Sequence, residues 1–236
     1  MRLAGLVAFE ETRQGATIKI GIIGAGNIGG TLTRRLAALG HDVVVANSRG
    51  PDTLRDLATA SGAKAVTVDD AVRDKALVIV SIPEKNIAKL SRELLAAARD
   101  DTVIVDTGNY YPQQRDGRID DIERGSTESR WVAKQLGRPV VKAFNNIYAK
   151  HLMERGKPRG AAGRIALPVA GDDPRAKRLV MQLVEELGFD AVDAGDLDES
   201  WRQQPGTPVY GTDRDSEGVR AGLEQAPKQR PAEFRA

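Results

Sequence analysis

The feature that most constrains this chain is a glycine-rich turn set between an apolar run and a helical pattern. Residues 24–29 read GAGNIG, the pattern Gly-x-Gly-x-x-Gly, and they follow directly on the apolar run IKIGII. Leu32, Leu36 and Leu39 then recur at helical spacing, and residues 42–46 form a second strand-like run, DVVVA. A strand, a glycine turn, a helix and a second strand make a βαβ unit of about thirty residues, which is typical of dinucleotide binding.

The three glycines of this motif have three separate expected tasks. Gly24 permits a tight turn off the strand, Gly26 lets the backbone approach a pyrophosphate, and Gly29 lets the helix pack closely on the strand. The N-terminus of the helix faces the phosphate charge. We therefore expect Asn27 and Ile28 to contact the cofactor together with the three glycines.

Short apolar runs alternate with helical patterns along the next 150 or so residues, as they do in chains with crossover connections. The further runs lie at residues 63–68, 76–81, 102–106, 139–144, 165–170 and 189–193. Continuous runs such as ALVIVS at 76–81 are typical of strands buried on both faces of a parallel sheet. The alternation predicts an α/β fold in a single domain, a Rossmann-type doubly wound and mostly parallel sheet of about eight strands. Ligands of such sheets bind outside the carboxyl ends of the strands.

The end of the second strand favours NADP over NAD. An NAD-selective site usually places Asp or Glu there to bind the ribose 2′-hydroxyl, and residues 47–50 read NSRG, with no acid. Ser48 can donate a hydrogen bond and Arg49 can pair with a doubly charged 2′-phosphate. The alternative, that Arg49 is only a solvated surface arginine, stays open.

Three further strand ends carry candidate site residues. The turn Ser81-Ile82-Pro83 holds the backbone extended beside a flat ligand, and Asn145 could orient a nicotinamide carboxamide or a substrate ring. We predict cofactor contacts for Ser81, Ile82, Pro83, Gly108, Asn109 and Asn145, and substrate contacts for Tyr110, Tyr111 and Asn146.

No acid–base pair is evident, so the catalytic residues are unknown and no dyad is expected. Neither Tyr-x-x-x-Lys nor Gly-x-Ser-x-Gly occurs, and no metal-ligand spacing is found. Hydride exchange between two bound rings fits this lack, because it depends on stacking and orientation while the cofactors carry the redox chemistry.

Composition and charge narrow the class of protein. The 236 residues are 41% hydrophobic, which suits one globular core, and no apolar run approaches the roughly 18 residues of a membrane span. The net charge is only +2 and the charges are mixed, so neither a nucleic-acid nor a membrane partner is expected. With no cysteine and only two histidines, no metal site is expected.

The chain divides into three expected segments. Residues 1–17 make a poor signal peptide and predict a disordered N-terminal extension of a cytoplasmic protein. Residues 18–194 form the NADP-binding Rossmann domain. Residues 195–236, where the patterning weakens, form an irregular C-terminal lid or interface segment and a tail.

On its motifs the chain resembles the NADP oxidoreductases that depend on the deazaflavin coenzyme F420, over about residues 18–194. The residues that carry the resemblance are the glycine motif, Asn47-Ser48-Arg49, Ser81-Ile82-Pro83, Gly171-Asp172-Asp173 and Asp193-Ala194-Gly195. The resemblance implies that Ser48 and Arg49 hold the 2′-phosphate and that Ile82-Pro83 border the nicotinamide. The chain is also similar to the cytoplasmic domains of membrane metalloreductases, which pass hydride to a flavin.

The resemblance implies hydride transfer between NADP(H) and a deazaflavin or flavin. Two alternatives stay open: reduction of another small acceptor such as a quinone, and a non-catalytic module that senses NADP. Outside the sheet, Trp201 and Arg202 are predicted to bind substrate, with their segment folded over the nicotinamide side of the pocket in one subunit or across a homodimer, which is the expected assembly.

Overall fold

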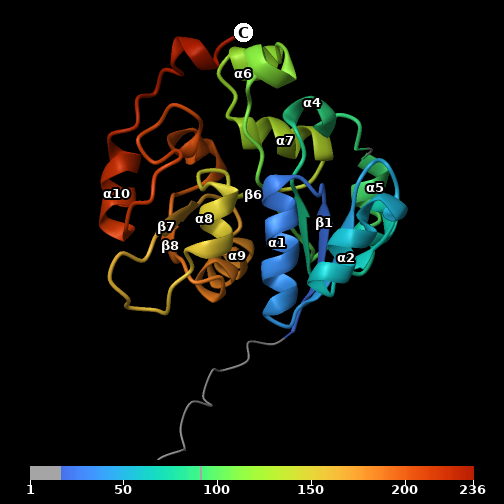
Figure 1. Ribbon diagram of the computed structural model, residues 1–236. Coiled ribbons are helices and arrows are strands. Elements are labelled where there is room, and N and C mark those ends of the chain that lie inside the picture. The colour runs from blue at the N-terminus through green and yellow to red at the C-terminus, as the bar shows by residue number, and fades with distance from the viewer. Residues whose placement is uncertain (1–16, 91) are drawn as a thin grey trace, which may run out of the picture.

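The central sheet explains where a ligand can bind. The computed structural model describes residues 17–90 and 92–236 (Figure 1), so the predicted extension, except for Thr17, lies outside the described residues. The sheet has six parallel strands in the order β3-β2-β1-β4-β5-β6. They are β1 (Lys19–Ile23), β2 (Asp42–Ala46), β3 (Lys64–Ala65), β4 (Leu77–Val80), β5 (Val103–Asp106) and β6 (Val141–Lys142). The strand order reverses between β1 and β4, which is the switch point where doubly wound sheets bind ligands.

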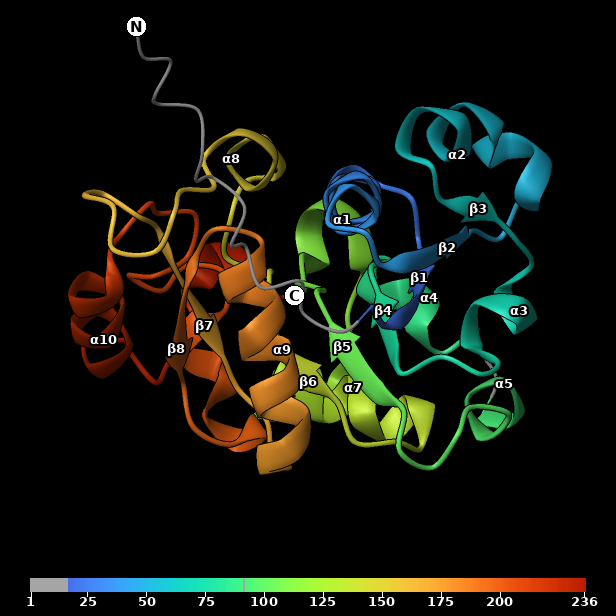
Figure 2. The same ribbon diagram turned by 90° about the horizontal axis from the view of Figure 1, so that it is seen from below.

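Helices cover both faces of this sheet, and two apolar clusters fill the layers between (Figure 2). One cluster contains Ile22 and Val45 under α1 (Asn27–Ala38), and the other contains Val78 and Ile104 on the opposite face. The further helices of this part are η1 (Pro51–Leu54), α2 (Arg55–Ser61), α3 (Val68–Val72), α4 (Glu84–Ile87), α5 (Arg92–Ala96), η2 (Pro112–Asp116), α6 (Asp120–Glu123) and α7 (Glu128–Leu136). Side chains of alternate strand residues enter opposite clusters, as the pleat of a doubly covered sheet requires.

The prediction of a doubly wound, mostly parallel α/β fold is confirmed, but the expected strands do not form one sheet. A second sheet pairs β7 (Ala166–Val169) with β8 (Asp190–Asp193) in parallel, joined through α9 (Pro174–Glu186). It meets the main sheet at a single antiparallel bridge, where Lys142 and Ala170 exchange hydrogen bonds of 2.8 and 3.0 Å. The long connection after β6 reverses the chain direction, so β7 cannot continue the parallel ladder.

The C-terminal segment is packed against this second sheet. It holds η3 (Leu197–Gln203), α10 (Ser216–Glu224) and η4 (Ala232–Phe234). Val219 and Leu223 of α10 form an apolar cluster with Val192 of β8 and Val209. Among the described residues, no helix is both long and apolar enough to cross a membrane.

Candidate functional site

The glycine turn has the geometry that a pyrophosphate cradle needs. Gly24 adopts a φ of +108°, and a Cβ there would lie 2.2 Å from the carbonyl oxygen of Ser81. A Cβ at Gly29 would lie 2.0 Å from the oxygen of Gly24, whereas a Cβ at Gly26 would meet nothing within 4 Å. The first and third glycines are thus required by packing, and the second borders open space that a ligand can fill.

Two cavities meet at this turn, and both are lined by Ala25 and Gly26. The strand-end cavity, of about 610 Å³, lies over the ends of β1, β2 and β4. Its lining includes Gly24, Asn47, Ser48, Ser81, Ile82, Pro83, Asn86 and Lys89. The helix cavity, of about 630 Å³, lies beside the start of α1, and its lining includes Asn27, Arg34, Arg49, Thr53, Asp56, Ala149 and Lys150. The structure therefore brings the predicted residues of the first, second and fourth strand ends to one trough.

The loop after β2 presents Ser48 and Arg49 to solvent. Asn47 fixes the loop, because its Oδ1 accepts from the Arg49 amide at 2.9 Å and its Nδ2 donates to Thr53 Oγ1 at 2.9 Å. The side chain of Arg49 is exposed and has no hydrogen bond or ion pair to any described residue. A free guanidinium on a fixed loop suits a phosphate.

The polar residues at the ends of β5 and β6 are engaged within the protein. Asn145 Nδ2 donates to Asn109 Oδ1 at 3.0 Å and to the Gln203 carbonyl at 2.7 Å, and its Oδ1 accepts from Gln203 Nε2 at 2.9 Å. Asn109 Nδ2 donates in turn to the Asn145 carbonyl at 2.9 Å. In this structure the amide of Asn145 holds η3 against the sheet: both hydrogens of Nδ2 are donated within the protein and Oδ1 already accepts one bond, and its predicted contact with the nicotinamide stays a prediction.

Beneath these strand ends lies a cluster of buried charges. Lys142 is fully buried, and its Nζ donates to Asp106 Oδ2 at 3.2 Å and to the Gly108 carbonyl at 2.6 Å. The buried carboxylate of Glu128 lies 3.8 Å from the same ammonium and is also paired with Arg230 at 2.8 Å. Burial alone would lower the pKa of Lys142, but the carboxylates of Asp106 and Glu128 raise it above its ordinary value. The ammonium therefore stays charged and holds the loop after β5 from below.

Glu84 belongs to the same cluster but lacks a hydrogen-bond partner. It is wholly buried at the start of α4, and neither carboxyl oxygen is hydrogen-bonded. Burial raises the pKa of Glu84 well above its usual range, and the Asp106 carboxylate adds to the shift. This carboxyl group is therefore favoured in its neutral form.

Tyr110 and Asn146, for which substrate contacts are predicted, are buried and bonded within the protein, and those contacts stay predictions. Tyr110 is 0% exposed, its hydroxyl bonds to Glu123 at 3.0 Å, and burial raises its pKa to about 12. Asn146 is 1% exposed and donates to the Val209 carbonyl at 3.3 Å. Tyr111, the next residue after Tyr110, is only partly buried, and its hydroxyl contacts that of Tyr210.

Within this chain Trp201 and Arg202 lie apart from the trough, so their predicted place over the nicotinamide side, in one subunit or across a homodimer, stays a prediction. Trp201 lines a separate cavity of about 740 Å³ between α7, η3 and the last residues of the chain, and no glycine-turn residue lines that cavity. Arg202 pairs with Glu199 at 2.5 Å, and its guanidinium lies 5.3 Å from the ring of Trp201. Both residues lie within η3, and neither lines the two cavities of the trough.

Sequence reasoning missed three residues near the trough. Thr53 and Lys150 line the helix cavity, and Tyr148, which is 58% exposed, precedes Ala149 in the same wall. Thr53 carries a local signal, since it lies four residues after Arg49 in the same loop. Tyr148 and Lys150 carry none, because only the tertiary fold brings α8 (Ala149–Glu154) beside α1.

The chain is similar to one family model and to several solved structures. The family model described as "NADP oxidoreductase coenzyme F420-dependent" matches residues 19–110. A crystal structure of the hypothetical protein SMa0349 from Sinorhizobium meliloti is 32% identical, covers 86% of this chain and 97% of that one, and superposes with a TM-score of 0.72. A protein from Arthrobacter sp. FB24 assigned as an F420-dependent NADP-reductase is 25% identical over 76% of this chain and 85% of its own, with a TM-score of 0.62.

Among curated proteins, the metalloreductase STEAP3 of Rattus norvegicus is 28% identical over 180 residues, which are 76% of this chain and 34% of that protein. The chain spans less than half the length of the curated relatives that it matches. The matched family model ends at Tyr110, so β6, α8 and everything after them lie outside it.

Proposed function

Residues 19–110 of this chain match the family model described as "NADP oxidoreductase coenzyme F420-dependent", and from that premise we propose that the protein transfers a hydride between NADP(H) and a deazaflavin or flavin. The family model and the name of the Arthrobacter protein both specify NADP, and STEAP3 is named a metalloreductase. The observation that carries the proposal is the open space over Gly26, where two cavities join beside the unpaired Arg49.

The residues of the trough fit NADP. Gly26 and the first amides of α1 would hold the pyrophosphate, and Ser48 and Arg49 would hold the 2′-phosphate. The turn Ser81-Ile82-Pro83 lines the strand-end cavity and would border the cofactor. When bound, NADPH supplies the hydride; the protein's task is to orient it and to exclude water.

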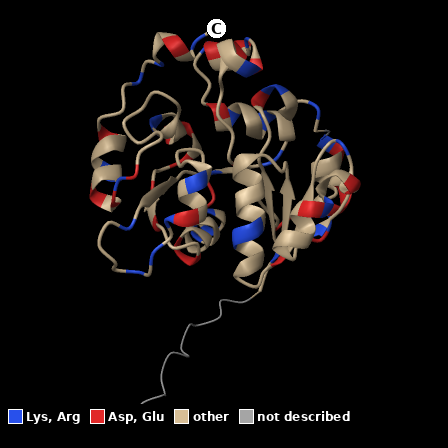
Figure 3. Ribbon diagram, in the orientation of Figure 1, with Lys and Arg blue, Asp and Glu red and all other residues tan. Residues whose placement is uncertain are grey.

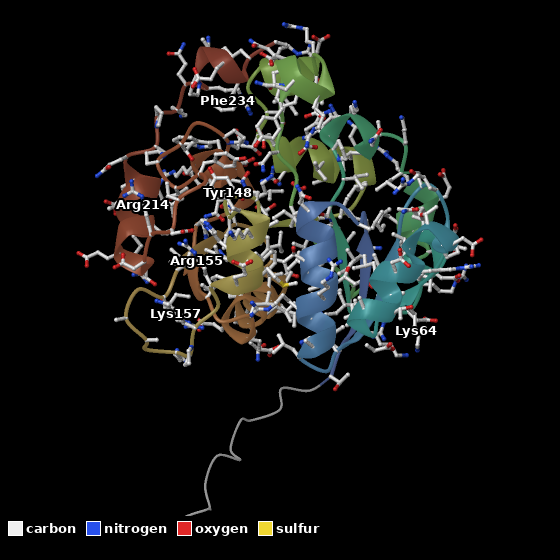
Figure 4. The ribbon with its side chains drawn as sticks, in the orientation of Figure 1. Lys64, Tyr148, Arg155, Lys157, Arg214 and Phe234 are labelled. Carbon is white, nitrogen blue, oxygen red and sulfur yellow. The ribbon has the colours of Figure 1, made fainter. Side chains whose placement is uncertain are left out.

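For the acceptor we propose a place beside Tyr148, which directly precedes Ala149 in the wall of the helix cavity. Tyr148 lies at the start of α8 (Figure 4), and a Cβ on Gly211 would lie 3.0 Å from its hydroxyl. Gly211 directly follows Tyr210, whose hydroxyl contacts Tyr111. Tyr148 is exposed and offers its ring to a flat acceptor, whereas the ring of Tyr111 already contacts Arg115 and Phe234. The transfer itself needs orientation more than a strong acid or base. A homodimer and a cytoplasmic location stay predictions.

Steady-state oxidation of NADPH with coenzyme F420, flavin mononucleotide and a quinone tests the proposal. We expect turnover with the deazaflavin or the flavin, and its loss in Gly26→Val. Turnover with the quinone alone would favour the other-acceptor alternative. Tight NADP binding by calorimetry without turnover on any acceptor would instead identify a sensing module.

A further inference from the structure

We propose that Lys150 on α8 binds the pyrophosphate of NADP(H) across the trough from Gly26, an inference that rests on the proposed function. Lys150 would be a cofactor-positioning residue contributed from outside the βαβ unit. Lys150 lies outside both the glycine motif and the matched residues 19–110.

Lys150 lines the helix cavity from α8. The helix cavity is bounded by the start of α1, by the loop from Arg49 into α2, and by α8. Lys150, Met153 and Glu154 all line it, and their spacing of three and four residues puts them on one face of α8. Figure 3 shows basic colour at the end of α8 that lies beside the start of α1.

The charges of this cavity leave room for an anion. Its lining contains three cations, Arg34, Arg49 and Lys150, and two acids, Asp56 and Glu154. Neither the ammonium of Lys150 nor the guanidinium of Arg49 pairs with any described residue, and Arg34 donates only to the Gly30 carbonyl at 3.2 Å. The positive end of the α1 dipole adds to this field, so a phosphate between α1 and α8 would meet cationic partners on both sides.

The backbone that carries Lys150 is held in place against α1. Arg35 of α1 donates to the carbonyl oxygens of Leu152 at 3.0 Å and Met153 at 2.9 Å, and Leu152 is wholly buried. On its other side α8 is fixed by Asp213, which pairs with His151 at 2.8 Å and with Arg155 at 2.5 Å. A cation on a fixed helix loses less freedom on binding than one on a mobile loop.

The position of Lys150 favours the pyrophosphate over the 2′-phosphate. Lys150 lies on α8, which packs against α1, and the start of α1 is where the motif predicts the pyrophosphate. Arg49 lies instead in the loop after β2, which Thr53 of η1 helps to fix. The two cations would therefore bind different phosphates. Arg49 would bind the 2′-phosphate, which NAD lacks, and Lys150 would bind the pyrophosphate, which NAD and NADP share.

Titration calorimetry with NADP⁺ and NAD⁺ tests this division in the wild type and in Lys150→Ala, Lys150→Arg and Arg49→Ala. Lys64→Ala is the matched control, because Lys64 is also exposed but lies on β3, away from α8 (Figure 4). We expect Lys150→Ala to weaken both dinucleotides by about fivefold to tenfold, less at high salt, and Lys150→Arg to restore most of the loss. Arg49→Ala should weaken NADP⁺ alone, and Lys64→Ala neither.

The outcomes separate cleanly. An equal loss for both dinucleotides in Lys150→Ala supports the proposal. A loss for NADP⁺ alone would move Lys150 to the 2′-phosphate, and no loss would make it a solvated surface lysine; either result overturns the proposal while the proposed function stands. A wild-type protein that binds neither dinucleotide would instead defeat the proposed function.

Discussion

At the ends of β1 and β2 the chain leaves its polar groups open, whereas at the ends of β5 and β6 it uses them itself. Arg49 and Lys150 have no partner among the described residues, and the space over Gly26 is empty of protein. Asn145, by contrast, makes three hydrogen bonds within the chain, and Lys142 is enclosed by carboxylates. Polar residues follow the strands in both places, so residue type alone does not distinguish them.

The difference shows how one sheet edge can serve two purposes. A polar group that binds a ligand must be free or hydrated in the free protein, because a group already bonded inside the core gains little from exchange. Saturated groups rigidify the frame instead. The β5–β6 side thus supports the position of the loops, and the β1–β2 side receives the charged cofactor.

The largest expected effect is at the ends of β5 and β6, the closed side, where the polar groups are bonded within the protein. Lys142→Met removes the cation that Asp106 and Glu128 share, and leaves buried carboxylates uncompensated. We expect a loss of about 3–5 kcal/mol in the free energy of unfolding, measured by urea denaturation. The matched Lys64→Met, at a side chain that is 75% exposed, should change it by less than about 0.5 kcal/mol. An unchanged midpoint for Lys142→Met would mean that the cluster is hydrated.

A second test adds a side chain at the ends of β1 and β2, the open side, where the polar groups are free. Gly26→Val should abolish dinucleotide binding with little change in thermal stability, because the added side chain enters space that the protein does not occupy. Gly29→Ala should do the reverse and lower stability by about 1–3 kcal/mol, because its Cβ would lie 2.0 Å from the Gly24 oxygen. Calorimetry and a thermal melt on both variants separate the two roles. Retained binding in Gly26→Val would place the phosphate site elsewhere.

The smallest expected effect concerns the unpartnered acid of the closed side. Because burial and Asp106 raise the pKa of Glu84, the folded state keeps a proton that the unfolded chain releases above about pH 4.3. Stability therefore falls as the pH rises from that value toward the folded-state pKa. Glu84→Gln removes this dependence, so we expect it to raise stability by about 1–2 kcal/mol at pH 7 and to change little near pH 4. Urea melts across this pH range check the prediction, and parallel curves for both proteins would contradict it.

The open side was predictable because its geometry is local. The turn at residues 24–29 and the loop at 47–53 are each organised by hydrogen bonds and packing between near neighbours or adjacent strands. The closed side was not, because its partners are distant: Gln203 lies 58 residues from Asn145, and Arg230 lies 102 residues from Glu128. No local sequence pattern predicts such pairs.

Tyr110 and Tyr111 show the same limit at the scale of two residues. Both follow β5, but one is wholly buried and the other is partly exposed. Neighbouring side chains of an extended backbone point to opposite sides, so a pair of tyrosines cannot share one environment. Which of the two faces the core depends on where α6 packs.

The three carbonyls that Arg35 binds have a consequence for the order in which the protein assembles. They belong to Leu152, Met153 and Leu187, which follow Arg35 by 117, 118 and 152 residues. Contacts of such separation close large loops and form late. During synthesis, the strands and the glycine turn can pair while the wall that carries Lys150 is still missing. If Lys150 binds the cofactor as proposed, the nascent βαβ unit is expected to capture NADP(H) weakly at first, and to retain it tightly only after Leu187 has emerged and α8 has docked on α1.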